Sequence, residues 1–419
     1  MTISVADARS GTASPAAASG GLVILLCSLV SILEGFDLQI IGVVGPQIAK
    51  SFHLDPGQLG VAFAASLVGL AIGAIAGGRL ADRWGRKPLL LLATLLFGVF
   101  TLATATAWNL NSLLALRFLT GLGLGGAMPN VIAIVAESAR RDRVTLAVAG
   151  MTCGLSAGGI LVAQIAHLMA AGSGWQSVFL IGGGLPILLL PALFWLLPET
   201  RRAAPEDGMK VRALRALFGQ GQVQVTIALW LVFGLTLLQL SLLLNWLPSL
   251  VIGKGLPREF GYFAATIFNL GGIVGSLLAG ALCDRFGARW PMLGCFGLMA
   301  IGYVGLSDAS SPVALMAACF VSGVAVLGAQ YALYGLSPRL YGDTERATGI
   351  GAAVAVGRIG AIIGPLLAGG LLKAGAGPAQ LMMLLLPLIA LAALAMACLA
   401  GAAGSRLAAA RPSSPHQTR

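Results

Sequence analysis

The sequence predicts an all-α membrane protein whose twelve transmembrane helices form two bundles of six. Composition is the first observation: 58% of the 419 residues are hydrophobic, 10% are charged, and the mean hydropathy is +0.91. Soluble proteins contain about 25% charged residues, so a soluble chain is excluded. The second observation is a series of twelve apolar stretches, each near the roughly 20 residues that cross a bilayer. The third is an internal duplication.

The apolar stretches follow one another along the whole chain. Their approximate limits are 21–44, 58–79, 89–107, 111–135, 144–170, 175–197, 223–250, 260–282, 290–307, 312–335, 346–372 and 379–402. Residues 1–20 are rich in Ala, Ser and Gly, so we expect them to be a disordered cytoplasmic tail. They are not expected to be a signal peptide, because the first apolar stretch is too long and continues through the two acidic residues. Residues 403–419 form a second predicted cytoplasmic tail.

The duplication shows in two basic turns, after the second and the eighth stretch. Aligning Asp82 with Asp284 gives an offset of 202 residues, and the same offset aligns Phe118-Leu-Thr-Gly121 with Phe320-Val-Ser-Gly323. The predicted bundles are therefore residues 21–197 and 223–402, joined by a charged cytoplasmic linker at 198–222. Two parallel repeats of six spans are typical of transporters whose central site opens alternately to each side.

The net charge of +11 is distributed unevenly between the loops. Alternate loops place 20 of the 26 Lys and Arg residues on one side of the membrane and four on the other. The positive-inside rule therefore places both termini in the cytoplasm. These clusters are solvated loop faces, so we expect no nucleic-acid partner.

Four charged residues lie inside predicted spans. Glu34 and Asp37 are three residues apart in the first span and can share a helix face, while Arg117 and Arg358 belong to the fourth and eleventh spans. A charge at this depth costs on the order of 3 kcal/mol, so such residues face inward and pair with one another or with a substrate. In the other half, the offset of 202 aligns these four with Thr236, Gln239, Cys319 and Ser156. The repeated fold does not require the charges.

We expect proton coupling in the amino-terminal half, through Asp37 with Glu34 and Arg117. Structural explanations remain open for each residue. The two acids could simply hydrogen-bond to neighbouring helices, Arg117 could be a strut bonded to backbone carbonyls, and Arg358 could hold the eleventh helix in place.

Several motifs resemble those of the major facilitator superfamily. They are the Gly-x3-Asp-Arg-x-Gly turn, present at Gly78 and again at Gly280, the run Arg117-Phe-Leu-Thr-Gly-Leu-Gly-Leu-Gly125, and Pro198-Glu-Thr200. A finer resemblance is to the aromatic acid/proton symporters. It rests on Glu34-Gly-Phe-Asp-Leu-Gln39, Asn245-Trp-Leu-Pro248, Arg346-Ala-Thr-Gly349 and Gly357-Arg-Ile-Gly360 running on to Gly364-Pro365. Within that family the chain is most similar to permeases for 3-(3-hydroxyphenyl)propionate, although other branches have Asp in place of Glu34.

The resemblance implies the major facilitator fold in a bacterial cytoplasmic (inner) membrane. It implies proton-coupled uptake of an aromatic carboxylic acid by alternating access, with 3-(3-hydroxyphenyl)propionate or a related hydroxylated benzoate or phenylpropanoate as the substrate. We expect no cofactor, because the proton gradient supplies the energy. The expected partners of this monomer are the acid, the proton and the lipid bilayer.

A substrate site would combine a cation with an apolar slot. Arg358 would bind the carboxylate through its bidentate fork. The first, seventh and tenth spans, which the resemblance places around the central cavity, contain the other candidates: Phe36, Gln239, Asn245, Trp246, Gln330, Tyr331 and Tyr334. For the aromatic residues, packing or an interfacial belt is the alternative.

Charged residues and glycines at the cytoplasmic helix ends are expected to act as conformational latches. These are Gly78, Asp82, Arg83, Gly85, Arg86, Glu137, Arg143, Asp284 and Arg285.

Other functions are less well supported by the residues. An enzyme is not expected, since the run from Gly45 to Ser51 lacks the glycine that precedes the lysine of a phosphate loop. A drug/proton antiporter is disfavoured because the fifth span lacks a Gly-Pro motif, although Gly364-Pro365 occurs in the eleventh. A symporter of non-aromatic organic acids remains open. A membrane sensor built on a transporter fold would be supported by a large cytoplasmic appendage, which the sequence lacks.

Overall fold

The computed structural model describes residues 20–140, 143–170, 172, 174–199, 218–219, 222–337, 340–341 and 346–409. Within these residues, twelve helical segments are long and apolar enough to cross a membrane, which confirms the predicted multi-pass all-α fold. The helices of the first half are α1 (Gly20–Phe52), α2 (Pro56–Trp84), α3 (Arg86–Thr104), α4 (Leu110–Ser138), α5 (Val144–Met169) and α6 (Trp175–Leu196). Those of the second half are α8 (Val223–Gly253), α9 (Arg258–Phe286), α10 (Arg289–Asp308), α11 (Pro312–Leu336), α12 (Arg346–Lys373), α13 (Pro378–Leu384) and α14 (Leu386–Ala409).

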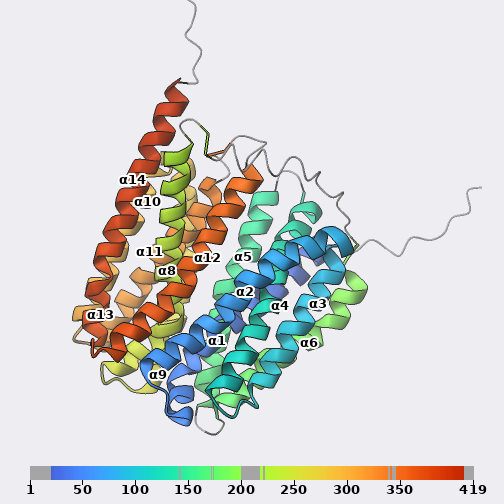
Figure 1. Ribbon diagram of the computed structural model, residues 1–419, viewed down its shortest axis with the longest axis vertical. Helices are drawn as coiled ribbons and strands as arrows, with labels where there is room; N and C mark the ends of the chain where they lie inside the picture. The colour runs from blue at the N-terminus through green and yellow to red at the C-terminus, as the bar shows by residue number, and fades with distance from the viewer. Residues whose placement is uncertain are drawn as a thin grey trace, which may run out of the picture.

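The helices form two bundles with the same internal arrangement (Figure 1). In the first bundle α2 packs along α4 and α1 along α5, and in the second α9 packs along α11 and α8 along α12. The helices that pack together in the second bundle are therefore the repeat equivalents of those that pack together in the first. The duplication seen in the sequence is therefore also a duplication of packing.

The largest differences between the helix limits and the apolar stretches lie in the first and the last span. Helix α1 continues beyond residue 44 to Phe52, and α14 continues to Ala409, within the segment expected to be a tail. The twelfth span is divided at Leu385 into α13 and α14, where Pro387 lacks the N–H that would continue the hydrogen-bond pattern. Most of the expected linker, residues 200–217 and 220–221, lies outside the described residues, as does the amino-terminal tail up to residue 19.

The basic turns of the two repeats share one backbone feature. Gly85, between α2 and α3, has a φ of 96°, and Gly287, between α9 and α10, has a φ of 75°. This is the left-handed region, which residues with a Cβ rarely adopt. The glycine at this position of the repeated motif is explained by that turn.

Glycines also allow the helices of each pair to approach closely. A Cβ at Gly121 of α4 would lie 2.0 Å from the carbonyl oxygen of Ser66 on α2, and a Cβ at Gly323 of α11 would lie 2.0 Å from the carbonyl oxygen of Phe268 on α9. Both residues of the second contact follow those of the first by 202 positions. Such small-residue contacts are how membrane helices associate without a hydrophobic driving force.

The bundles contact each other mainly through α2 against α12 and α5 against α9. At the end of the molecule where α1 ends, a Cβ on Gly60 of α2 would lie 2.7 Å from the carbonyl oxygen of Pro365 on α12. On the other side of the same end, Gln164 Nε2 of α5 donates to Thr266 Oγ1 of α9 at 2.8 Å. The bundles are thus closed against each other at this end.

Replacing Gly121 by alanine should force α2 and α4 apart, because the added methyl group has no space beside the Ser66 carbonyl. Overpacking of this kind costs about 1–3 kcal/mol, and we expect a correspondingly lower melting temperature for the detergent-solubilised protein. Gly184→Ala in α6 is the matched control, since an added Cβ there meets nothing within 4 Å. Equal losses in the two variants would contradict the packing argument.

Candidate functional site

The two acids of α1 lie near the middle of the protein in different surroundings. Glu34 and Asp37 are both almost completely buried, with 2% and 1% of their surface exposed. Asp37 contacts side chains of α3 and α4 in its own bundle. Glu34 has no hydrogen-bond partner among the described residues. Their spacing of three residues allows a shared face, but the two carboxylates have different neighbours.

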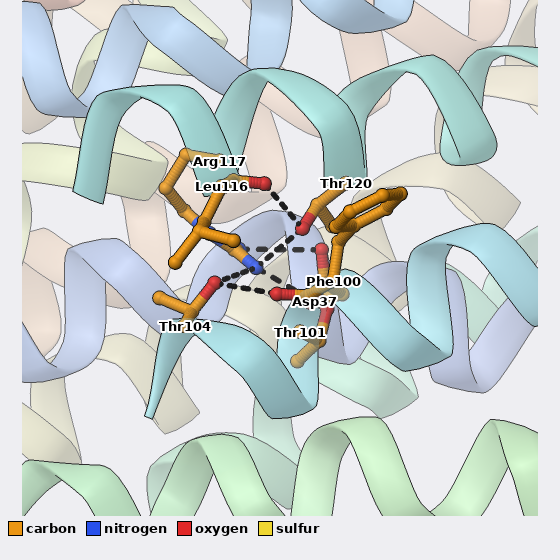
Figure 2. Close-up of polar contacts among 7 residues, drawn as sticks. All are labelled: Asp37, Phe100, Thr101, Thr104, Leu116, Arg117 and Thr120. Carbon is orange, nitrogen blue, oxygen red and sulfur yellow. Dashed lines mark hydrogen bonds and ion pairs between the residues drawn. The ribbon is translucent and has the colours of Figure 1, made fainter. Parts of the chain in front are cut away.

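Asp37 sits in a polar cluster inside the first bundle (Figure 2). The hydroxyl of Thr101 on α3 donates to Oδ1 of Asp37 in a short hydrogen bond, and Arg117 Nη1 on α4 lies 3.4 Å from Oδ2. Both members of this ion pair are fully enclosed. A buried pair of this kind is tolerated only where further hydrogen bonds satisfy the remaining polar atoms.

The remaining donors of Arg117 are directed at threonine hydroxyls. Its Nη2 lies 2.9 Å from Thr120 Oγ1, 3.2 Å from Thr101 Oγ1 and 3.3 Å from Thr104 Oγ1. The guanidinium also stacks 5.0 Å from the centre of the Phe179 ring, a favourable cation–π distance. Only Nε is without a partner among the described residues. Arg117 is therefore bound to side chains, and not to the backbone carbonyls of the strut alternative.

Sequence reasoning missed the three threonines of this cluster. Scattered threonines in an apolar span give no signal by themselves. The internal repeat gives a weak signal, because the positions 202 residues later hold Tyr303, Leu306 and Ser322, and two of these also have hydroxyl groups.

The cation that acts electrostatically on Glu34 belongs to the other bundle. Arg358 of α12 is the charged group whose field acts on Glu34, although no hydrogen bond or ion pair between them is formed in the described structure. Both carboxylate oxygens of Glu34 and the Nε of Arg358 are buried without a partner there. The described structure thus leaves these atoms of an acid in the first bundle and of an arginine in the second without hydrogen bonds.

Several predicted substrate residues are engaged in packing. Phe36 lies against Gly182 of α6 inside the first bundle, and Asn245 donates to the carbonyl oxygen of Ser241 one turn earlier in α8. Trp246 donates to the Pro365 carbonyl at 3.0 Å and packs edge-on against Phe63 of α2. These contacts agree with the packing alternative for Phe36 and Trp246.

Both glutamines predicted to bind the substrate have side-chain atoms without a hydrogen-bond partner among the described residues. Gln239 accepts a 2.8 Å hydrogen bond from Tyr303, which leaves its Nε2 without a partner, and both amide atoms of Gln330 are unpartnered among the described residues. Tyr331 of α11 reaches the other bundle, where its hydroxyl donates to the Thr152 carbonyl of α5 at 3.4 Å. Tyr334 packs against Phe233 of α8.

A buried amide pair joins the bundles beside these groups and was not predicted. Gln39 of α1 donates to Asn269 Oδ1 of α9 at 3.3 Å, and Asn269 donates back to Gln39 Oε1 at 2.8 Å. Gln39 also reaches the Leu155 carbonyl of α5. The pair lies toward the closed end of the molecule, two residues along α1 from Asp37.

Some of the predicted latch residues contact one another. Arg86 of α3 forms a short ion pair with Glu137 of α4, and a Cβ on Gly85 would meet Glu199. Arg285 stacks over the neighbouring Phe286 ring. Gly78 and Arg83 are exposed, Arg143 and Asp284 are exposed and have interaction partners, and the side chain of Asp82 lies outside the described residues.

Metal binding has no support in the described structure. Among the residues that it places, no group of three or more His, Cys, Asp or Glu side chains could hold a metal ion.

The sequence matches a family model and is similar to known transporters. The model of the Major Facilitator Superfamily matches residues 27–265 and 255–417. The 3-(3-hydroxy-phenyl)propionate transporter of Escherichia coli (strain K12) is 40% identical over 378 residues, covering 90% of this chain and 93% of that protein. The gallate transporter of Pseudomonas putida is 35% identical over 412 residues, covering 88% and 90%.

Solved structures share the fold at low sequence identity. The crystal structure of a D-xylose-proton symporter superposes with a TM-score of 0.77 at 19% identity, covering 90% of this chain and 97% of the other. An inward open conformation of a xylose transporter from E. coli gives a TM-score of 0.73 at 19% identity, covering 90% and 95%. With the sequence matches, these findings show that the chain belongs to the Major Facilitator Superfamily, and within it to the aromatic acid/proton symporter family.

Proposed function

We propose that this protein imports an aromatic carboxylic acid together with protons, by alternating access across a bacterial cytoplasmic membrane. The observation that supports this most directly is the arrangement of the charged residues within the spans, of which Glu34, Asp37 and Arg117 are buried and Arg358 is partly buried. Asp37 is paired with Arg117 within the first bundle, whereas Glu34 has no hydrogen-bond partner among the described residues and lies within the electrostatic influence of Arg358 in the second bundle. The excess of basic residues in the loops on one side supports a cytoplasmic position for both termini.

Arg358 is the proposed binding group for the carboxylate of the substrate. Arginine presents a planar fork of donors that matches a carboxylate, and its buried Nε has no partner in the described part of the chain. The aromatic ring would lie between the bundles, with Tyr331 and Tyr334 of α11 as apolar walls and the free amides of Gln239 and Gln330 as partners for a ring hydroxyl. The preferred substrate is 3-(3-hydroxyphenyl)propionate, in keeping with the relative from Escherichia coli.

Proton coupling is proposed for the acids of α1. An anion entering a cell at negative potential is opposed by about 2.3 kcal/mol per charge per 100 mV, and a proton that moves with it cancels this cost. Asp37, bonded to Thr101 and Arg117, is the proposed proton carrier, assisted by Glu34. Protonation of Asp37 would weaken its ion pair with Arg117 and leave Arg117 held by its three threonine partners. This would change the packing of α1 against α4.

Uptake of labelled 3-(3-hydroxyphenyl)propionate into cells should test the proposal. In the wild type we expect uptake to rise as the external pH falls and to stop when an uncoupler is added, because the proton gradient drives it. Asp37→Asn removes the titrating carboxyl but keeps its shape, and we expect it to lose accumulation. Wild-type uptake that ignored both pH and uncoupler would exclude symport.

Asp55→Asn is the matched control for Asp37→Asn, because it also replaces a carboxyl by an amide. It should leave the stimulation of uptake by low external pH intact. Asp55 lies outside the membrane-spanning segments, where the backbone N–H of Gln58 and the ammonium of Lys373 lower the pKa of its carboxyl. A carboxyl with a lowered pKa stays ionised until the pH falls through that value, below its usual value of about 4. Its titration cannot produce a change in uptake at about pH 5–7, so a pH profile altered by this substitution would count against the α1 acids as the sensors.

Removing Arg117 alone should be more damaging than removing both charges. Arg117→Leu leaves Asp37 as an unpaired buried carboxylate, for which we expect a loss of about 3–5 kcal/mol in the free energy of unfolding. Adding Asp37→Asn to the same protein should recover part of that loss, because no charge then remains to be paired. Thermal unfolding of the single and double variants in detergent measures this, and strictly additive losses would show that the two residues are not coupled.

A further inference from the structure

The face of α9 that meets the first bundle has a row of hydrogen bonds. Tyr262, Thr266 and Asn269 are four and three residues apart, so their side chains share one face of the helix. Each contacts one glutamine of the first bundle, and these are Gln47 of α1, Gln164 of α5 and Gln39 of α1. The distances are 2.6 Å at Tyr262, 2.8 Å at Thr266, and 2.8 and 3.3 Å for the reciprocal pair at Asn269. All of these groups are neutral amides and hydroxyls.

The equivalent face in the first half is apolar. An offset of 202 residues aligns the three residues of α9 with Gly60, Ala64 and Leu67 of α2, all of which are buried. None of these three has a polar side-chain atom. Helix α2 packs against α12 as α9 packs against α5, and α12 is the repeat equivalent of α5. The two sides of the closed end therefore correspond through the repeat, but at these positions only the α9 side is polar.

The backbones come closest on the apolar side. A Cβ on Gly60 of α2 would lie 3.2 Å from the Cα of Gly369 on α12. The repeat equivalents of these two glycines are Tyr262 and His167, whose rings pack edge to face with their centroids 6.0 Å apart. Where α2 and α12 are in direct backbone contact, α9 and α5 are thus separated by two ring side chains.

Water would act differently on the two sides. Water that enters between α9 and the first bundle can take the place of each neutral hydrogen bond, which is why such bonds add only modestly to net stability. Between α2 and α12 it would replace close van der Waals contacts, and Gly60, Ala64 and Leu67 have no polar side-chain atom to hydrate. Separation of the bundles therefore costs less on the α9 side.

We propose that the bundles part along this face of α9, away from α5 and α1, to admit the acid from outside, while α2 and α12 remain in contact as the pivot. This inference rests on the proposed function, since it names the route by which the proposed substrate enters. In the proposed orientation, the end of the molecule where α1 ends is the outer end. The opened passage is lined by Gln164, Thr266 and Asn269, whose amides and hydroxyl can hydrogen-bond the carboxylate and the ring hydroxyl of the acid. It leads to Gln39, two residues along α1 from Asp37.

Cross-linking across each side tests the inference. Gln164→Cys with Thr266→Cys places a thiol pair between α5 and α9, where the two wild-type side chains are hydrogen-bonded. Asp55→Cys with Lys373→Cys places a thiol pair at the outer ends of α2 and α12, where the wild-type side chains form an ion pair of 3.1 Å. A short, reducible bifunctional thiol reagent bridges either pair in cells. We expect the bridge between α5 and α9 to abolish uptake of labelled 3-(3-hydroxyphenyl)propionate, and the bridge between α2 and α12 to leave uptake largely unchanged.

Two controls establish that a loss of uptake is due to the bridge. Each variant is measured before the reagent is added and again after a reducing agent has cleaved the bridge, and uptake at both stages shows that the variant is folded. The wild type, whose six cysteines are free, receives the same reagent, and uptake by the variants is expressed relative to it.

Spin labels on the same two cysteine pairs give a second measurement that needs no transport. The pairs are introduced into a variant whose native cysteines are replaced by alanine, and the purified protein is studied in lipid vesicles. We expect an additional, longer distance for the pair on α5 and α9, and a single distance for the pair that replaces Asp55 and Lys373.

The outcomes separate this inference from the proposed function. Uptake lost with either bridge, or lost only with the bridge between α2 and α12, would overturn the pivot, and unchanged uptake with α5 bridged to α9 would overturn the entry route. In each of these cases the transport of an aromatic acid still stands. If the wild type takes up no aromatic acid, the proposed function fails, and the spin-label distances then decide the inference: a single distance between α5 and α9 overturns it.

Discussion

The hydrocarbon core of a bilayer offers no hydrogen-bond partner, and this constraint explains how the backbone groups, the helix contacts and the buried charges of this structure are arranged. Backbone groups are satisfied within helices, and the helices approach through glycines such as Gly121 and Gly323, which bring one backbone against another. The same constraint applies to charge. Asp37 and Arg117 are fully enclosed, and the three threonines and Phe179 around them replace the water that both would otherwise require.

The two halves of the protein share an architecture and differ in chemistry. The positive-φ turns at Gly85 and Gly287 and the close helix contacts at Gly121 and Gly323 belong to the fold, because each recurs after 202 residues. The polar cluster does not recur in charged form. Where the first half has the Thr101 hydroxyl donating to Asp37, the second half has the Tyr303 hydroxyl donating to Gln239, 202 residues later in both cases. The second half therefore retains the hydrogen bond but has an amide in place of the carboxyl.

Much of the fold could be predicted from the sequence because its physical cause is local. An apolar stretch of the right length predicts a span whatever its neighbours are, and a repeated turn predicts a repeated bundle. Helix limits were less accurate, since α1 continues past its apolar stretch to Phe52, and the break at Leu385 depends on the single residue Pro387.

The charged residues of the candidate site could be predicted from the sequence, whereas the residues that contact them could not. A buried Asp or Arg stands out in an apolar span because burying it is costly. Which neighbour offsets that cost depends on how helices distant in sequence are rotated against each other. For this reason the threonines around Arg117, the separate surroundings of Glu34 and Asp37, and the position of Phe36 against Gly182 required the structure.

The amide pair of Gln39 and Asn269 has a consequence for how such a protein responds to its surroundings. Two reciprocal hydrogen bonds join the bundles there, and neither side chain has a net charge. Separating the two amides moves no net charge through the electric field of the membrane, and dissolved ions have no charge on this pair to screen. Membrane voltage and ionic strength can therefore act on the acids, the arginines and the bound anion while leaving this connection between the bundles unaffected.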